Sequence, residues 1–285
     1  MKKLRIIRIV LAAAFLVASV LCFVLGREAQ PRVIAGAVAG AERLQIEPFY
    51  FAESAGVILV WLIITLVWGR IYCSTVCPVG ALADVMLHLR RRIPALNKPF
   101  SYSKPRRIRY HLLLVYAVSL AMGLTVVPLV FDPWFVMGNM LQPFGGKISA
   151  LWVKCGYSAL WGMIWGVVSV IILLPWALLR GREFCNTVCP MGTVLGYVSR
   201  RSAFRITIDG DRCISCMKCQ DNCRSSCIKV AERYVDNGRC VKCFECVAHC
   251  PQNAIRYTQE RRRPASPLFG GVRKGMKGAE GAEGA

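Results

Sequence analysis

Two matching runs of four cysteines near the end of the chain constrain its fold more than any other feature. In each run three cysteines lie three residues apart and a fourth follows four residues later; the runs are Cys213, Cys216, Cys219 and Cys223, then Cys240, Cys243, Cys246 and Cys250. Three thiolates at this spacing wrap one iron–sulfur cubane. Zinc sites instead pair one Cys-x-x-Cys with a distant second pair. The sequence therefore predicts two [4Fe–4S] clusters.

The expected ligand sets cross between the two runs, because the fourth cysteine of each run serves the other cluster. Cluster 1 takes Cys213, Cys216, Cys219 and Cys250, and cluster 2 takes Cys240, Cys243, Cys246 and Cys223. Arg224 stands where the first run should carry the proline that follows Cys250 in the second. Cys227 is an additional cysteine, interpreted as a packing residue beside the cluster or as a substitute for Cys223 in a distorted turn.

The surroundings of the runs predict a small α+β domain of the bacterial two-cluster ferredoxin type over residues 201–260. Residues 204–208 and 254–258 alternate like the short strands that frame such a domain. The remaining residues, 261–285, are rich in arginine, proline and glycine, and this composition predicts a disordered tail.

Four apolar runs approach the length of about 20 residues that a helix needs to cross a bilayer; they are residues 6–25, 54–68, 111–130 and 156–179. The whole chain is 55% apolar yet has a net charge of +21. That combination is typical of membrane proteins with basic cytoplasmic loops. Nucleic acid is not an expected partner, because the basic residues flank apolar runs instead of forming one face. Residues 1–200 are therefore expected to form an all-α membrane bundle of four transmembrane helices.

The distribution of lysine and arginine predicts the orientation of this bundle. Four basic residues precede or begin the first apolar run, and nine lie between Arg70 and Arg109. The other two loops carry few basic residues. The expected location is the cell inner membrane, with a multi-pass chain, a cytoplasmic middle loop and both termini in the cytoplasm.

Residues 69–80 recur as residues 181–192, at an offset of 112 residues with no gap. Each copy follows an even-numbered apolar run and ends in Cys-x-x-x-Cys-Pro, which contributes Cys73 and Cys77, then Cys185 and Cys189. Cysteines four apart share one face of a helix. They are interpreted either as apolar contacts at a helix end or as a redox or metal-binding site, which in its strongest form unites all four thiols.

Two carboxylates precede the second and fourth apolar runs, Glu47 in Glu-Pro-Phe and Asp132 in Asp-Pro-Trp. Carboxylates near a membrane face are common proton-relay groups. The competing interpretation is ordinary capping of the following helix. The histidines, His88, His111 and His249, stand singly and do not form a pair that would suit a haem.

With the apolar runs, the paired Cys-x-x-x-Cys-Pro motifs and the double cluster run in this order, residues 1–258 resemble one family. It is the NapH-type group, the ferredoxin-type quinol dehydrogenase membrane subunits of periplasmic nitrate reductase systems. Membrane parts of nitrous-oxide reductase regulators and cytochrome oxidase assembly ferredoxins are related to it.

The resemblance implies a subunit of an electron-transfer complex that works between the quinone pool and a partner redox protein. The partner would be a ferredoxin or a multihaem cytochrome subunit, and the direction of flow stays open. The alternative is an assembly or regulatory protein that handles copper or another metal through Cys73, Cys77, Cys185 and Cys189.

Overall fold

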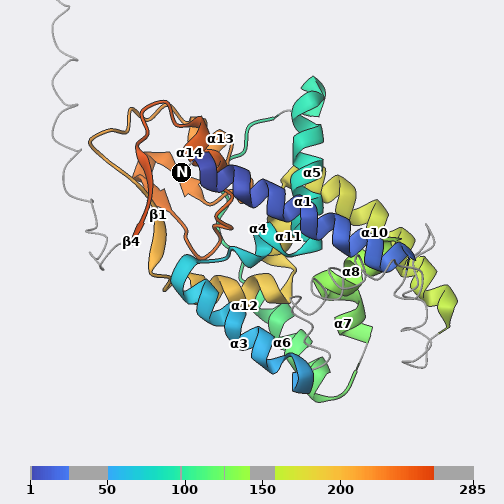
Figure 1. Ribbon diagram of the computed structural model, residues 1–285. Coiled ribbons are helices and arrows are strands. Elements are labelled where there is room, and N and C mark those ends of the chain that lie inside the picture. The colour runs from blue at the N-terminus through green and yellow to red at the C-terminus, as the bar shows by residue number, and fades with distance from the viewer. Residues whose placement is uncertain (1, 26–50, 97, 125, 142–157, 260–285) are drawn as a thin grey trace, which may run out of the picture.

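The computed structural model describes residues 2–25, 51–96, 98–124, 126–141 and 158–259 (Figure 1). The described part is mostly helical, with short strands near its C-terminal end. The elements in chain order are α1 (Lys2–Leu25), α3 (Phe51–Trp68), α4 (Tyr72–Thr75), α5 (Pro78–Arg92), η2 (Pro94–Leu96), α6 (Ile108–Ala121), α7 (Val126–Phe131), α8 (Pro133–Leu141), α10 (Ala159–Arg180), α11 (Glu183–Thr187), α12 (Pro190–Ser199), β1 (Phe204–Ile208), α13 (Lys218–Asp221), β2 (Ile228–Lys229), η4 (Val230–Glu232), β3 (Tyr234–Val235), α14 (Glu245–His249) and β4 (Ile255–Gln259).

Each of the four apolar runs contains a helix. Two helices are long and apolar enough to cross a membrane, over Lys3–Leu21 and Leu160–Arg180, whereas Gly56–Trp68 and Ile108–Ala121 are shorter apolar helices. Large apolar side chains lie exposed along all four; Val10, Ile63, Leu114 and Ile171 are examples. Exposed apolar surface of this extent is unfavourable in water, so these helices support association with a membrane.

The prediction of one continuous helix over residues 111–130 is wrong, because the structure has two helices there. Helix α6 ends at Ala121, and α7 begins only at Val126. Gly123 lies between them with a φ of +71°. A residue in the left-handed conformation interrupts a right-handed helix. Glycine adopts this conformation without the steric cost that a side chain brings. The apolar run is therefore continuous in sequence but not in structure.

The repeat in the sequence is also a repeat in the structure. Gly69 and Gly181 have φ values of +84° and +65° and end helices α3 and α10. The short helices α4 and α11 follow. Helices α5 and α12 then each begin with a proline at N1, a position that needs no backbone N–H donor. The two copies thus share one helix–turn–helix path through the motif.

The strand-bearing part confirms the expected framing strands. β1 and β4 pair in antiparallel fashion, with Phe204 opposite Gln259 and Ile208 opposite Ile255. β2 and β3 form a second antiparallel pair. The backbone of Ala203 donates to Leu66 O at 2.9 Å, and the Tyr257 hydroxyl donates to Trp68 O at 2.8 Å. This part therefore sits on the end of α3.

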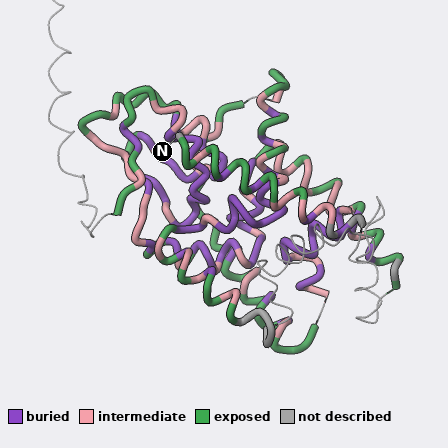
Figure 2. The backbone as a smooth tube through the Cα atoms, in the orientation of Figure 1, coloured by how far each residue is buried: buried purple, intermediate pink, exposed green. Residues whose placement is uncertain are grey.

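Buried residues concentrate where the strand-bearing part meets the repeat, while the long helices remain largely exposed (Figure 2). The N-terminal end of α1 lies against α14 at this junction (Figure 1). Glu47 and residues 260–285, with the predicted tail, lie outside the described residues. The predicted domain limits and the number of membrane crossings stay predictions.

Candidate functional site

The first cavity in the strand-bearing part is lined by Cys213, Cys216, Cys219 and Cys250. These are the four residues of the predicted ligand set for cluster 1. The rest of its wall is largely apolar and includes Ile208, Ile214, Met217, Val230 and Ile255. Four thiols in an apolar pocket suit an iron–sulfur cluster, whose iron atoms bind thiolates.

The second cavity is lined by Cys223, Cys227, Cys240, Cys243 and Cys246. It therefore brings together the predicted ligands of cluster 2 and the additional cysteine. The two halves have matching backbones, because residues 27 apart share a left-handed conformation: Ser215 and Lys242, Met217 and Phe244, Ser226 and Asn253. These tight turns bring the cysteines of each run to face a common cavity.

Cys227 occupies the place of Ala254 in the other half. Ala254 N donates to Cys250 Sγ at 3.3 Å, and Cys227 N donates to Cys223 Sγ at 3.4 Å. The sulfurs of Cys223 and Cys227 lie 3.5 Å apart, and either could donate the hydrogen bond between them. This geometry favours Cys223 as the thiolate and Cys227 as a packing residue, although both line the cavity.

No three His, Cys, Asp or Glu side chains within the described ranges lie close enough to hold one metal ion. That holds for the eight cysteines of the two runs as well. A cubane is larger than a single ion and separates its ligands more widely. The preference for iron–sulfur clusters over zinc comes from the cysteine spacing, since a zinc site has four ligands that converge on one atom.

The four cysteines of the repeat, Cys73, Cys77, Cys185 and Cys189, are all buried. They lie in one core that also contains Cys243 of the second cavity. Burial raises the pKa of Cys189 well above its ordinary value, and the neighbouring thiols of Cys185, Cys77 and Cys73 raise it further. The structure thus brings both copies of the motif together beside the second cavity.

One arginine from each copy of the motif donates a hydrogen bond to a backbone carbonyl of the other copy. Arg70 Nη2 from the first copy donates to Cys185 O at 3.1 Å. Arg182 Nη1 from the second copy donates to Cys73 O. Glycines make these carbonyls accessible, because a Cβ at Gly80 would lie 2.2 Å from Cys73 O and a Cβ at Gly192 would lie 1.9 Å from Cys185 O. No larger residue fits there, since real Cβ atoms do not approach this closely.

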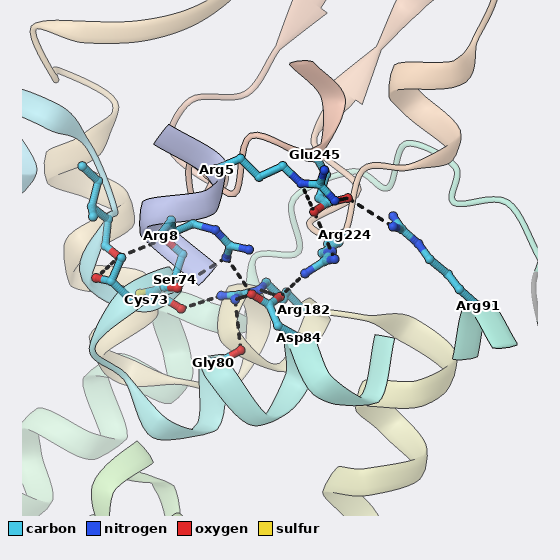
Figure 3. A network of polar contacts seen from close by, with 12 residues as sticks. Arg5, Arg8, Cys73, Ser74, Gly80, Asp84, Arg91, Arg182, Arg224 and Glu245 are labelled. Carbon is cyan, nitrogen blue, oxygen red and sulfur yellow. Dashed lines mark hydrogen bonds and ion pairs between the residues drawn. The ribbon is translucent and has the colours of Figure 1, made fainter. Parts of the chain in front are cut away.

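A buried ionic network joins the strand-bearing part to the helices (Figure 3). Asp84 accepts from Arg8 at 2.6 Å and lies 2.8 Å from both Arg182 and Arg224. Arg224 also reaches Glu245 at 3.2 Å. Glu245 in turn pairs with Arg5 and Arg91. The network thus connects α1, α5, the repeat and the second cysteine run.

Sequence reasoning missed this network, although two signals were present. Arg224 occupies the place of an expected proline, and Asp84 is the one acidic residue between Gly69 and Arg109. Both residues are largely buried, with side-chain exposures of 6% and 13%. A charged residue that replaces an expected apolar one indicates a specific buried partner, since an unpaired buried charge is costly.

Asp132 makes the contact that the capping interpretation predicts. Its Oδ1 accepts from the backbone N of Trp134 at 3.0 Å, at the start of α8, and its Oδ2 lies 3.3 Å from the Tyr116 hydroxyl. The side chain is fully buried. A proton-relay role is therefore not needed to explain Asp132.

A family model described as a 4Fe-4S binding domain matches residues 53–96 and 161–208. The matched segments hold α3, α10 and both Cys-x-x-x-Cys-Pro motifs, and they end at the first strand of the ferredoxin-like part. The match thus falls on the structural repeat. No solved structure matches the chain.

Of three relatives with known descriptions, two are described as ferredoxin-type proteins and one as a putative electron transport protein. The methylamine utilization ferredoxin-type protein MauN of Paracoccus denitrificans is 28% identical over 224 residues, which are 73% of this chain and 72% of the relative. The ferredoxin-type protein NapH of Escherichia coli is 28% identical over 171 residues, 59% of this chain and 52% of the relative. The putative electron transport protein YccM of the same organism is 26% identical over 180 residues, 62% and 48% respectively.

The family model and these relatives show that the chain is similar to ferredoxin-type iron–sulfur proteins, and the two cavities gather the cysteines of the predicted ligand sets. The chain spans about half the length of two of the three relatives named. The relatives named NapH agree with the resemblance predicted from the order of motifs, and the chain is similar to the NapH-type ferredoxin-like proteins.

Proposed function

We propose that this protein carries electrons between the membrane quinone pool and a partner redox protein through two [4Fe–4S] clusters. The observation that carries the proposal is the pair of cavities, each lined by one complete ligand set that the cysteine spacing predicts. Cys213, Cys216, Cys219 and Cys250 would hold cluster 1, and Cys240, Cys243, Cys246 and Cys223 would hold cluster 2. Each bound cluster supplies one-electron transfer.

The two cavities differ in their exposure, which supports a direction between membrane and partner. Cys216 is exposed beside the first cavity, and its neighbours Ile214 and Met217 are 62% and 42% exposed. The cysteines of the second cavity are all buried, and Cys243 shares a core with the repeat. This difference supports a proposal in which a soluble partner, such as a ferredoxin or cytochrome subunit, docks beside the first cavity and electrons pass between the second cavity and the membrane helices.

The proposal includes four membrane crossings with both termini in the cytoplasm of a cell with an inner membrane. Helices α1 and α10 have the length to cross. Helices α3 and α6 would cross with the residues that flank them. The positions of the basic residues support the orientation. Menaquinol or ubiquinol would then be oxidised at the membrane end of the repeat.

A second candidate function is metal handling for the maturation of another enzyme. The observation that favours it is the group of four buried thiols in the repeat, a donor set that suits soft metals such as Cu(I). In that function the two clusters of the ferredoxin-like part would supply electrons to the metal, and quinol would not be a substrate.

The test uses the full chain, purified anaerobically and placed in lipid nanodiscs. A soluble quinol analogue is added, and cluster reduction is followed by loss of visible absorption and by electron paramagnetic resonance. We expect quinol to reduce the clusters. Clusters that dithionite reduces but quinol does not would contradict the proposal, and stoichiometric copper binding in the same preparation would favour the second candidate.

A further inference from the structure

A cavity of about 330 Å³ shares no lining residue with either cysteine cavity. Its walls come from residues between Arg90 and Arg106, from the end of α10, from α11, and from Ser226 and Arg239 of the ferredoxin-like part. We call it the loop cavity, after the loop of residues 98–106, which supplies much of its lining. None of the described residues that line it is a cysteine. The loop cavity is therefore a candidate site for a ligand other than an iron–sulfur cluster.

The lining of the loop cavity is strongly basic. Six of its residues carry a positive charge: Arg90, Lys98, Lys104, Arg106, Arg180 and Arg239. Glu183 is the one acid among the described lining residues, and Arg106 and Arg180 already share it at 3.3 and 3.6 Å. Neither Lys98 nor Lys104 forms an ion pair with any described residue. The cavity therefore has positive charge that the described part of the protein does not neutralise.

Arg239 is a buried cation with one unused donor. The residue is 3% exposed, its Nε donates to Asp236 Oδ2 at 2.8 Å, and its Nη1 donates to Ser103 Oγ at 3.3 Å. Its Nη2 is buried and has no hydrogen-bond partner among the described residues. A buried donor without an acceptor is destabilising, and more so when it is charged. An anionic oxygen bound in the cavity would supply the missing acceptor.

Hydrogen bonds of the protein itself hold the loop in place. Arg90 Nη2 donates to Lys98 O at 2.6 Å, and its Nη1 donates to Leu179 O at 2.9 Å. Ser103 N donates to Ser226 O at 3.2 Å. The loop is thus joined to the end of α10 through Arg90 and to the ferredoxin-like part through Ser103. Because these contacts form without a ligand, the donors of the cavity are already gathered before an anion binds.

The loop cavity lies at the end of a helix that is long and apolar enough to cross a membrane. That helix, α10, qualifies over Leu160–Arg180, and both Leu179 and Arg180 line the cavity. Leu179 is 55% exposed. Lipid headgroups lie at the depth where a membrane-crossing helix ends, and basic pockets at that depth bind anionic headgroups. The position of the cavity therefore favours a membrane lipid as the source of the anion.

We propose that the loop cavity binds a phosphate group through Lys98, Lys104 and Arg239, either in the headgroup of an anionic phospholipid or as free phosphate. Lysine and arginine form short, charge-assisted hydrogen bonds to phosphate oxygens. A phosphate offers more acceptor oxygens than a carboxylate, so it can accept from all three side chains. The bound group would join the loop to the ferredoxin-like part. This inference does not depend on the proposed electron-transfer function, since it concerns neither the clusters nor quinol.

The test measures thermal unfolding of the full chain, purified anaerobically in a neutral detergent, as each probe is added. The probes are a short-chain phosphatidylglycerol and inorganic phosphate, and phosphatidylcholine of the same chain length is the zwitterionic control. A ligand that binds the folded state raises the unfolding midpoint with its concentration, which yields an apparent affinity. We expect phosphatidylglycerol to raise the midpoint more than phosphatidylcholine does.

The double variant Lys98→Gln, Lys104→Gln removes two donors from the cavity. Each lost charge-assisted hydrogen bond should weaken binding about tenfold. The double variant Arg92→Gln, Arg107→Gln is the matched control, because it removes the same charge from exposed residues that do not line the cavity. It should keep the wild-type affinity. Unliganded midpoints near that of the wild type show that both variants fold.

The two probes distinguish the sources of the phosphate. A response to phosphatidylglycerol alone identifies a lipid site, and a response to inorganic phosphate identifies a site for free phosphate. Either response supports the proposal if the cavity variant loses it and the control variant keeps it. No response to either probe beyond that to phosphatidylcholine would overturn the proposal. So would an equal loss of affinity in both double variants, because that result indicates general attraction of anions to a basic surface.

Discussion

Replacement of Asp84 by asparagine should separate the ferredoxin-like part from the helices that carry it. Asp84 accepts from three arginines, at 2.6 Å from Arg8 and 2.8 Å from Arg182 and Arg224. The asparagine side chain keeps the shape and removes the charge. Three buried cations would then face one another without their shared anion. Loss of one partner from a buried ion pair costs about 3–5 kcal/mol.

The assay is thermal unfolding in detergent micelles. With roughly 2–4 °C lost per kcal/mol for a chain of this size, Asp84→Asn should lower the midpoint by about 6–20 °C. Asp209→Asn is the matched control, because Asp209 pairs with Arg212 at 3.8 Å and Arg256 at 3.2 Å, both half-exposed. Exposed pairs contribute about 0–1 kcal/mol. Equal midpoint shifts for the two variants would refute the reasoning.

The same carboxylate predicts the direction of the pH dependence. Burial alone would raise the pKa of Asp84, but the charges of Arg182, Arg224 and Arg8 outweigh it and hold the pKa well below its ordinary value of 3.8. A lowered pKa in the folded state stabilises the protein above the unfolded pKa. The wild type should therefore lose stability as the pH falls below about 4, and Asp84→Asn should show a weaker loss.

The remaining predictions test the repeat, the ligands of cluster 2 and the membrane topology. Gly80→Ala and Gly192→Ala should each impair assembly, because the new Cβ would meet Cys73 O or Cys185 O, whereas Gly56→Ala, with nothing within 4 Å, should be neutral in expression and melting. Cys223→Ser should abolish the cluster 2 signal in electron paramagnetic resonance and Cys227→Ser should preserve it; the opposite result would make Cys227 the ligand. Reporter fusions after Leu96 and after Thr258 should read as cytoplasmic and a fusion after Leu141 as external, and an external signal after Thr258 would overturn the four-crossing topology.

The ferredoxin-like part, residues 201–260, was the most predictable part of the molecule. Its cysteine spacing and the alternation at residues 204–208 led to the framing strands, which β1 and β4 confirm. Local spacing sufficed because a cluster-binding run turns within a few residues. The ligand sets themselves stay predictions, although each cavity gathers the residues of one set.

The helical part was predictable only in outline. Hydropathy located the helices but not the break at Gly123, because an apolar run gives no information on the backbone conformation of one glycine. The repeat predicted that Cys73 and Cys185 are equivalent. It did not predict that each copy's arginine reaches the other copy, since that contact joins residues more than a hundred positions apart.

The asymmetry of the repeat explains why two similar copies are not interchangeable. Arg182 is neutralised by Asp84, and Asp84 also binds Arg224 of the ferredoxin-like part. The first copy's arginine has Gly196 at the equivalent position and contacts Gly238 of the loop that leads to Cys240. One arginine therefore shares its acid with the ferredoxin-like part, while the other reaches that part through a backbone carbonyl. The two copies follow one backbone path but connect the helices to the ferredoxin-like part by different contacts, one ionic and one neutral.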